Sequence, residues 1–175
     1  MNDEKSPLFP EEVRRLIAEH RIFSGGRRHR ELVGELLPEG AVWIDIVVPL
    51  SDVYAQYRHY DEPILVFASG DPLFFGFTTT LMREFEGRVT KTFPSFSSLQ
   101  MLAHALRLPY HDMRVVSLTG RPWHEFDRAL IERAHKVGVL TDRKNTPATI
   151  AKRMLDYGYT AYRMHIGVLL GGERE

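Results

Sequence analysis

The stretch ILVFASGDPLFFGF, from Ile64 to Phe77, decides the fold class of this chain. Five apolar residues in a row, Ile64 to Ala68, lead directly into the polar turn Ser69-Gly70-Asp71-Pro72, and a second apolar run follows. A short apolar run without polar alternation predicts a strand that is covered on both faces, as in a parallel sheet flanked by helices. The stretch therefore predicts a strand, a tight loop and a helix in an α/β protein.

The turn after this strand is a candidate binding site. In open parallel sheets, ligands lie beyond the carboxyl ends of the strands. Gly70 lets the backbone turn and approach a ligand closely, and Asp71 offers a carboxylate. The same Gly-Asp-Pro sequence is also ordinary turn chemistry, so a purely structural turn is the alternative interpretation.

The rest of the chain repeats the order of strand, loop and helix. The expected strands are 21–24, 42–48, 63–68, 88–93, 115–118, 136–141 and 159–166, with 63–68 as the central strand. The expected helices are 10–20, 31–37, 52–59, 75–85, 99–106, 125–134 and 148–157. This alternation predicts an α/β fold with a mostly parallel sheet. We expect two lobes, residues 1–110 and 111–175, with the boundary near Tyr110.

Composition excludes several classes of protein. The 175 residues, 43% of them hydrophobic, suffice for one domain or two small lobes. Twenty-three basic residues balance twenty-three acidic ones, so no overall field attracts nucleic acid or an anionic membrane. The absence of cysteine excludes disulfides and thiolate sites. No apolar stretch approaches the roughly 20 residues that span a bilayer, and the polar N-terminus is unlike a signal peptide, so we predict a cytoplasmic protein.

Several familiar catalytic motifs are absent from the sequence. It has no GxGxxG dinucleotide loop, no GxxxxGK[ST] phosphate loop and no Gly-x-Ser-x-Gly nucleophile elbow. The eight histidines are scattered, and no two lie one helical turn apart as a pair of metal ligands would. We therefore predict no metal site and interpret most of the histidines as ordinary surface or helix residues.

Two further loops at predicted strand ends carry small polar residues. In Pro94 to Ser98, the hydroxyls of Ser97 and Ser98 would join the free N–H groups of a helix N-terminus, although helix capping is the simpler role for either. The loop from Thr141 to Pro147 follows a third strand. Three such loops at the carboxyl edge of a parallel sheet predict a cleft for a polar, small-molecule cofactor.

Arginines follow two of the predicted strands. Arg27, Arg28 and Arg30 come after Gly25-Gly26, and Arg121 comes after Thr119-Gly120. Such arginines are either a solvated patch or a bidentate site for carboxylates.

These pieces, in this order, resemble the tetrapyrrole methylase family. The segments that carry the resemblance are ASGDPLFFG (Ala68 to Gly76), PSFSSLQ (Pro94 to Gln100) and VLTDRKNTPATIA (Val139 to Ala151). Within the family, three other segments are most similar to the CbiE-type precorrin-6Y C5,15-methyltransferases, also found as the N-terminal half of fused CobL-type proteins. These are GGRRH (Gly25 to His29), SLTGR (Ser117 to Arg121) and LLGGERE (Leu169 to Glu175).

The resemblance implies two α/β lobes with S-adenosylmethionine in a cleft between them, usually in a homodimer. It implies methylation of a precorrin at C5, at C15 or at both carbons in cobalamin biosynthesis, with a fused or separate CbiT-type methyltransferase and decarboxylase as partner. The implied cofactor contacts are Ser69, Gly70, Asp71, Phe74, Ser97, Ser98 and Thr141. The implied contacts to the carboxylates of the tetrapyrrole are Arg27, Arg28 and Arg121, and no catalytic base is indicated.

Three departures from the family pattern leave alternatives open. The first strand of the family and its glycine-proline loop are absent before the first helix, and the second-lobe strands that follow the Gly-Gly-x-x-Glu segment are absent after Glu175, so we expect a fold truncated at both ends. Ser95 also replaces a glycine. The alternatives are an enzyme of the same fold that acts on another precorrin, on ribosomal RNA or on diphthine, and a non-catalytic lobe of a larger fused enzyme.

Overall fold

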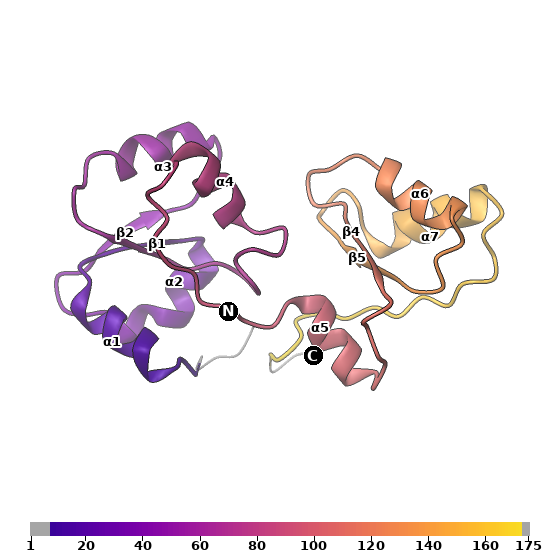
Figure 1. The fold of residues 1–175 in the computed structure, drawn as a ribbon, viewed down its shortest axis with the longest axis horizontal. Coiled ribbons are helices and arrows are strands. Elements are labelled where there is room, and N and C mark those ends of the chain that lie inside the picture. Colours follow the sequence, from indigo (N-terminus) through magenta and orange to yellow (C-terminus); the bar gives the residue numbers. More distant parts are fainter. Residues whose placement is uncertain (1–7, 173–175) are drawn as a thin grey trace. The chain divides into compact units, whose positions relative to one another are not determined.

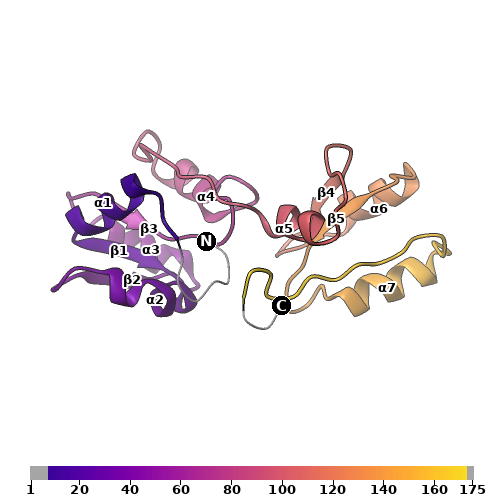
Figure 2. The ribbon, with the colours of Figure 1, turned by 90° about the horizontal axis from the view of Figure 1, so that it is seen from below.

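The computed structural model describes residues 8–172, which form two compact units. The first unit contains residues 8–97 together with 171–172, and the second contains residues 98–170. Figures 1 and 2 show the elements of both units. The lobe boundary expected near Tyr110 remains a prediction. Of the segment from Leu169 to Glu175, the last three residues lie outside the described part of the chain.

The first unit contains a parallel sheet of three strands, β1 (Ile22–Gly25), β2 (Val42–Asp45) and β3 (Ile64–Val66). The strand order is β2-β1-β3, so β1 is the central strand, and all four of its residues are buried. β3 is an edge strand, and its residues are only partly buried. The central place predicted for residues 63–68 is therefore wrong, because β1 lies between the other two strands.

Helices cover both faces of this sheet. Ile22 on one face of β1 packs in a cluster with Val53 of α3 (Leu50–Tyr57) and Leu81 of α4 (Phe77–Glu84). Phe23 faces the other way, into a cluster with Val13 and Ile17 of α1 (Glu11–Glu19) and Val33 of α2 (Arg27–Val33). Successive strand residues point to opposite faces, so this apolar pair requires a cover on each side. The predicted α/β fold with helices on both faces is confirmed.

α2 begins earlier than the sequence pattern predicts. Gly26 is the N-cap residue and the helix runs from Arg27 to Val33, followed by a 3-10 turn at Gly34–Leu36. The predicted helix 31–37 is therefore wrong at both ends. The three arginines Arg27, Arg28 and Arg30 lie in the first turns of a helix, because the His29 side chain accepts a hydrogen bond from the Gly26 backbone and caps the helix there.

The second unit contains two parallel strands, β4 (Arg114–Ser117) and β5 (Val137–Leu140). α6 (His124–Ile131) and α7 (Pro147–Asp156) enclose its core; the buried residues of this core are Val116, Leu118, Phe126, Ala129, Leu130 and Ile150. α5 (Ser98–Ala105) contacts β5 at Gly138, where an added Cβ would lie 3.0 Å from a Leu99 methyl carbon. The glycine thus allows the helix to approach the strand closely.

The strand predicted at residues 88–93 is wrong, because the segment forms no strand. In a strand, Val89 and Phe93 would point to the same face. In the structure, Val89 packs against the cluster of α3 and α4, whereas Phe93 packs against the cluster of α1 and α2. The segment therefore contacts both cores of the unit instead of pairing with a strand.

The strand predicted at residues 159–166 is also wrong. Tyr159 and Tyr162 pack against the core of the second unit, and the Tyr162 hydroxyl donates a hydrogen bond to the Ala134 carbonyl at 2.9 Å. Beyond them, Met164 and Ile166 are largely exposed, and β4 and β5 pair only with each other among the described residues. No helix within residues 8–172 has the length and apolar character that crossing a bilayer requires.

Candidate functional site

The carboxyl ends of β1 and β3 bring two loops of the first unit together. The strands are parallel neighbours with Ser24 opposite Val66, so the Gly25-Gly26 segment and the Ser69 turn leave the sheet at the same edge. The Gly26 backbone N–H donates to His29 Nδ1 at 3.1 Å. His29 Nε2 lies 3.0 Å from Ser69 Oγ, which joins the start of α2 to the turn after β3.

The turn from Ser69 to Gly76 is held by its own backbone and by Asp71. Gly70 has a φ of +59°, a conformation that favours glycine. One Asp71 carboxylate oxygen accepts the Leu73 N–H at 2.8 Å, and the Asp71 carbonyl accepts the Phe74 N–H at 3.1 Å. A Cβ at Gly76 would lie 2.3 Å from the Pro72 carbonyl oxygen. Asp71 thus organises the turn, and Gly76 allows the chain to return close to it.

Ser97 lies against this turn. A Cβ at Gly70 would be 3.4 Å from Ser97 Cα and 3.5 Å from the Phe96 carbonyl oxygen. Ser97 is buried, whereas Ser69 and the Phe96 ring are exposed. The structure therefore places the Gly-Asp-Pro turn and the end of the serine segment side by side, with Gly70 packed against the backbone of Phe96 and Ser97.

In the second unit, Asp142 joins the loops that follow β4 and β5. One of its carboxylate oxygens accepts the Gly120 N–H at 2.8 Å, and the other accepts the N–H groups of Lys144 and Asn145 at 2.9 and 2.6 Å. These bonds favour the ionised form, so they hold the pKa of Asp142 below its ordinary value, with the Asn145 N–H as the largest cause. The Thr119 hydroxyl also donates to the Thr141 carbonyl at 3.1 Å.

Asn145 anchors the same loop from the inside. It is buried, and its side-chain amide donates to the Leu118 carbonyl at 2.8 Å. Thr146 then caps α7 by accepting the Thr149 N–H at 3.3 Å. The loop from Thr141 to Pro147 is thus an ordered turn, in which the polar side chains bond to the backbone.

The residues predicted to form the site fall into two groups. Ser69, Gly70, Asp71, Phe74 and Ser97 belong to the first unit, where the Phe74 ring packs edge to face on Phe75 with the ring centres 5.1 Å apart. Arg27 and Arg28 also belong to this unit. Ser98, Thr141 and Arg121 belong to the second unit, and all three are exposed.

Arg27 of α2 pairs within its own helix. Arg27 pairs with Glu31 one helical turn away, with Nε 3.0 Å from Oε1. Its side chain is 92% exposed, so the pair stabilises the helix little and leaves the guanidinium accessible to a ligand.

Sequence reasoning missed three residues of these loops: His29, Asp142 and Asn145. His29 lies within the GGRRH segment, but its residue type alone grouped it with the ordinary histidines. A sequence signal existed, because a side chain at the third position of a helix can bond back to its N-cap residue. Asp142 and Asn145 precede the Thr-Pro start of α7, a pattern in which short polar side chains bond to the backbone.

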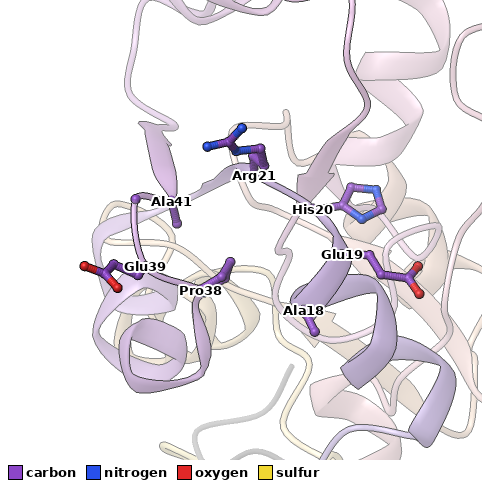
Figure 3. A pocket seen from close by; sticks show the side chains of 8 residues that line it. Ala18, Glu19, His20, Arg21, Pro38, Glu39 and Ala41 are labelled. Atoms are coloured by element: carbon purple, nitrogen blue, oxygen red, sulfur yellow. The ribbon is translucent and has the colours of Figure 1, made fainter.

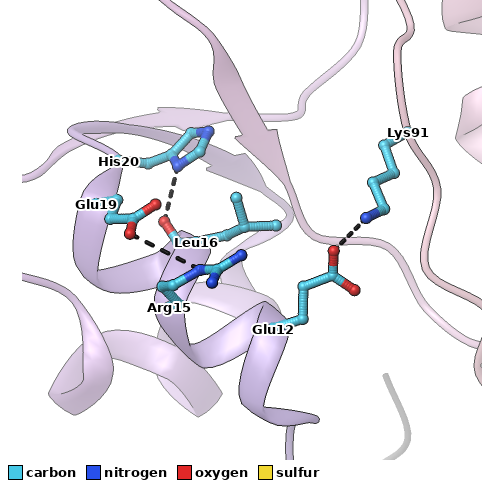
Figure 4. A network of polar contacts seen from close by, with 6 residues as sticks. All are labelled: Glu12, Arg15, Leu16, Glu19, His20 and Lys91. Atoms are coloured by element: carbon cyan, nitrogen blue, oxygen red, sulfur yellow. Dashed lines mark hydrogen bonds and ion pairs between the residues drawn. The ribbon is translucent and has the colours of Figure 1, made fainter.

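A hollow of about 210 Å³ lies at the opposite, amino-terminal ends of β1 and β2 (Figure 3). Figure 3 shows the carboxylates of Glu19 and Glu39 pointing in opposite directions, with small side chains such as Ala18 and Ala41 between them. Beside it, His20 bonds to the Leu16 carbonyl at 2.7 Å and Lys91 pairs with Glu12 (Figure 4). The first contact closes the carboxyl end of α1, and the second joins α1 to residue 91.

Within residues 8–172, no group of three or more histidine and carboxylate side chains is placed to hold a metal ion.

Comparison with known proteins decides the family. A family model described as Tetrapyrrole (Corrin/Porphyrin) Methylases matches residues 5–175. The chain belongs to the tetrapyrrole methylase family. This confirms the resemblance drawn from the six sequence segments, and it places the Ser69 turn and the Ser97 segment within a tetrapyrrole methylase.

Curated relatives of this tetrapyrrole methylase include two precorrin enzymes. It is 33% identical over 167 residues to a precorrin-6Y C(5,15)-methyltransferase [decarboxylating] of Sinorhizobium, an alignment that covers 94% of this chain and 40% of the relative. It is 33% identical over 156 residues to a cobalt-precorrin-7 C(5)-methyltransferase of Salmonella typhimurium, covering 87% of this chain and 73% of the relative. The chain thus spans well under half the length of the Sinorhizobium relative.

The crystal structure of the cobalamin biosynthesis precorrin-6Y methylase (cbiE) from Archaeoglobus fulgidus has the same fold. Its TM-score to this tetrapyrrole methylase is 0.58 at 19% sequence identity, over 81% of this chain and 71% of that one. The CbiE-type fold predicted from the sequence is confirmed.

Proposed function

We propose that this chain is an S-adenosylmethionine-dependent C-methyltransferase that acts on a precorrin, at C5, at C15 or at both carbons, in cobalamin biosynthesis. Family membership supports methyl transfer to a tetrapyrrole, and the names of the two curated relatives support a precorrin as the acceptor. The observation that carries the proposal is the close approach of the Gly70 turn to Ser97, at a strand end of a chain in this family.

The residues of the first unit fit the amino-acid and ribose parts of such a cofactor. A Cβ at Gly70 would lie 3.4 Å from Ser97 Cα, so the turn and the Ser97 segment pack side by side, and together they offer backbone groups to a ligand. Exposed Ser69 offers a hydroxyl, and the Asp71 carboxylate borders the same turn. Hydroxyl and carboxylate groups suit the ammonium and hydroxyl groups of the cofactor.

S-adenosylmethionine supplies an activated methyl group when bound, so the protein has to supply alignment and a site that excludes water. Alignment of two reactants in a site is worth up to roughly 7–11 kcal/mol of the barrier. Ser69, Gly70, Asp71, Phe74 and Ser97 would hold the cofactor on the first unit, and we assign Ser98 and Thr141 to the same role from the second. Arg27, Arg28 and Arg121 would bind the carboxylates of the tetrapyrrole.

Two finer proposals accompany this function. We assign the chain to a homodimer in the cytoplasm, as the family resemblance implies. Because the Sinorhizobium relative is named a decarboxylating C(5,15)-methyltransferase and this chain matches 40% of it, we propose that a separate or fused CbiT-type partner completes the decarboxylating reaction.

The test of the proposed function is transfer of a radiolabelled methyl group from S-adenosylmethionine. Precorrin-6Y, a different precorrin and ribosomal RNA would be offered in parallel, and label on precorrin-6Y alone is expected. Label on the other substrates would assign the chain to a different methylase of this fold. Binding of the cofactor without transfer to any of them would identify a non-catalytic lobe, which contradicts the proposal.

The Asp71→Asn variant tests the role of the carboxylate. Asparagine keeps an oxygen that can accept the Leu73 N–H, so the turn is retained while the charge is lost. Since a bond to a charged group is worth about 1–2 kcal/mol more than a neutral one, S-adenosylhomocysteine should bind about tenfold more weakly. Unchanged affinity by calorimetric titration would remove Asp71 from the site.

A further inference from the structure

The end of β1 is built so that a histidine can pack against it. Gly25 is buried, and a Cβ there would lie 3.0 Å from His29 Cβ and 3.0 Å from the Trp43 ring. These distances are shorter than ordinary contacts, so glycine leaves room for both side chains without a shift of either. The His29 ring is thereby held between the end of the strand and the turn after β3.

Two hydrogen bonds fix the state of the His29 ring. The Gly26 N–H can only donate, so His29 Nδ1 accepts and carries no proton. In the neutral ring the proton is then on Nε2, which donates to Ser69 Oγ at 3.0 Å. A serine hydroxyl that accepts one bond directs its own hydrogen elsewhere. Ser69 is exposed, so this hydrogen is available to an acceptor oxygen of a ligand.

We propose that His29 is a positioning residue, which holds the Ser69 hydroxyl as a donor toward an acceptor oxygen of the bound cofactor. The functional part of this proposal rests on the proposed function; the ring state and the bond to Ser69 do not. The occupant that this donor suits is a carboxylate or ribose oxygen, because both accept hydrogen bonds. His29 acts through Ser69, which lies 40 positions later in the chain, at the start of the turn.

Two variants separate the proposed role of His29 from a purely structural role as the cap of α2. Asparagine places an acceptor where Nδ1 lies, so His29→Asn keeps the cap on Gly26 but does not reach Ser69. Glutamine is long enough to place a donor where Nε2 lies, so His29→Gln restores the bond to Ser69. If His29 only caps α2, then the asparagine variant should behave as the wild type.

The binding test is calorimetric titration with S-adenosylhomocysteine of the full chain and of His29→Asn, His29→Gln, Ser69→Ala and the double variant His29→Asn/Ser69→Ala. We expect about tenfold weaker binding for His29→Asn, most of it restored in His29→Gln. The double variant should bind no more weakly than Ser69→Ala, because both changes remove the same interaction. His59→Asn is the matched control, since the His59 ring bonds to the Ala55 carbonyl four positions away, at 2.7 Å, and the affinity of this variant should not change.

Wild-type affinity in His29→Asn, or additive losses in the double variant, would overturn the proposal. A separate measurement covers variants that fold poorly: a long-range proton–nitrogen NMR spectrum of the wild-type imidazoles. We expect His29 to carry its proton on Nε2, with or without ligand. A ring that averages between tautomers overturns the bond to Ser69 whatever the affinity. A fixed Nε2–H ring in a chain that binds no cofactor would instead contradict the proposed function alone.

Discussion

At the scale of single residues, the clearest constraint on the site is Gly76. A Cβ there would lie 2.3 Å from the Pro72 carbonyl oxygen, and a backbone atom cannot move aside as a flexible side chain can. The Gly-Asp-Pro turn and the start of α4 thus depend on this residue. The two glycines of the turn differ in geometry: Gly70 has a φ of +59° and packs against Ser97, and Gly76 lets the chain close behind it.

Gly76→Ala should destabilise the first unit by about 1–3 kcal/mol, because the added methyl group overpacks the turn. Gly34→Ala is the control: Gly34 is helical, and nothing lies within 4 Å of an added Cβ, so alanine there should be neutral or slightly stabilising. Urea unfolding measures both, with the fluorescence of Trp43 reporting the first unit in a Trp123→Phe background. Equal midpoints for Gly76→Ala and the parent would contradict the tight turn.

The lowered pKa of Asp142 predicts how the stability of the second unit depends on pH. The pKa of Asp142 is lowered in the folded chain, so its contribution to stability is complete above the ordinary value of 3.8 and is lost as the pH falls through the lowered pKa. The second unit should therefore lose stability on acidification below about pH 4.

In Asp142→Asn this loss on acidification should be smaller. Stability at pH 7 should be lower than in the parent, because the amide N–H₂ group would face a backbone N–H that a carboxylate oxygen accepts in the parent. Trp123 fluorescence in a Trp43→Phe background reports the second unit. Asp112 also has a lowered pKa, from its bond to Lys136, so part of the acid dependence should remain in the variant. Identical acid profiles for variant and parent would exclude the Asp142 contribution.

At the scale of elements, a buried polar pair joins β1 to α3. Burial raises the pKa of the Tyr57 phenol, so its hydroxyl stays protonated and can donate to Ser24 Oγ at 2.6 Å. Ser24 in turn donates to the Ile44 carbonyl of β2 at 2.7 Å. This chain of bonds satisfies a serine in the middle of a fully buried strand.

Tyr57→Phe should cost about 0.5–1.5 kcal/mol, because Ser24 keeps its bond to Ile44. Ser24→Ala should cost more, about 1–3 kcal/mol, because it leaves the buried tyrosine hydroxyl without its acceptor. Denaturant unfolding in a background with Trp43 as the sole tryptophan compares the two. A larger loss in Tyr57→Phe than in Ser24→Ala would contradict donation from the Tyr57 hydroxyl to Ser24.

This pair also explains why the longest apolar run is not the central strand. Ile64 to Ala68 has the longer apolar run, whereas β1 contains Ser24 and Gly25. The partner that makes Ser24 acceptable in the interior is 33 positions away, so it is not visible in any local window. Periodicity predicted the existence of these strands well, but the order of strands depends on such distant contacts.

The two wrong strand predictions, at 88–93 and 159–166, also arise because distant contacts are not visible in a local window. Both segments contain several β-branched or aromatic residues, which favour a strand. Val89 and Phe93 instead contact opposite cores, and Tyr162 bonds to the Ala134 carbonyl. A strand needs a neighbour, and a single sequence does not say where the neighbour lies. The turn at Ser69 to Gly76, in contrast, was predictable because glycine, aspartate and proline act locally.

At the scale of the whole molecule, the family assignment rests on segments that lie far apart in the chain. Six motifs in order predicted the family, and the family model then matched residues 5–175. The motifs did not predict the bond from His29 to Ser69, which depends on how α2 lies against the turn after β3.

The proposed homodimer gives a prediction at this scale. Sedimentation equilibrium of the full chain at micromolar concentration should give twice the 20.2 kDa mass of one chain. A mass of one chain at every concentration tested would contradict the dimer, while leaving the cofactor site of the first unit unaffected.

The central claim is that the Gly70 turn and Ser97 bind S-adenosylmethionine, and calorimetric titration with S-adenosylhomocysteine tests it most directly. Gly70→Ala and Gly40→Ala form a matched pair, because both glycines have positive φ, +59° and +75°, and alanine carries the same backbone strain at either position. Only at Gly70 does the added Cβ meet Ser97, whereas nothing lies within 4 Å at Gly40. The wild type and Gly40→Ala should bind with micromolar affinity and Gly70→Ala should lose it. No binding by the wild type, or equal binding by all three, would contradict the claim.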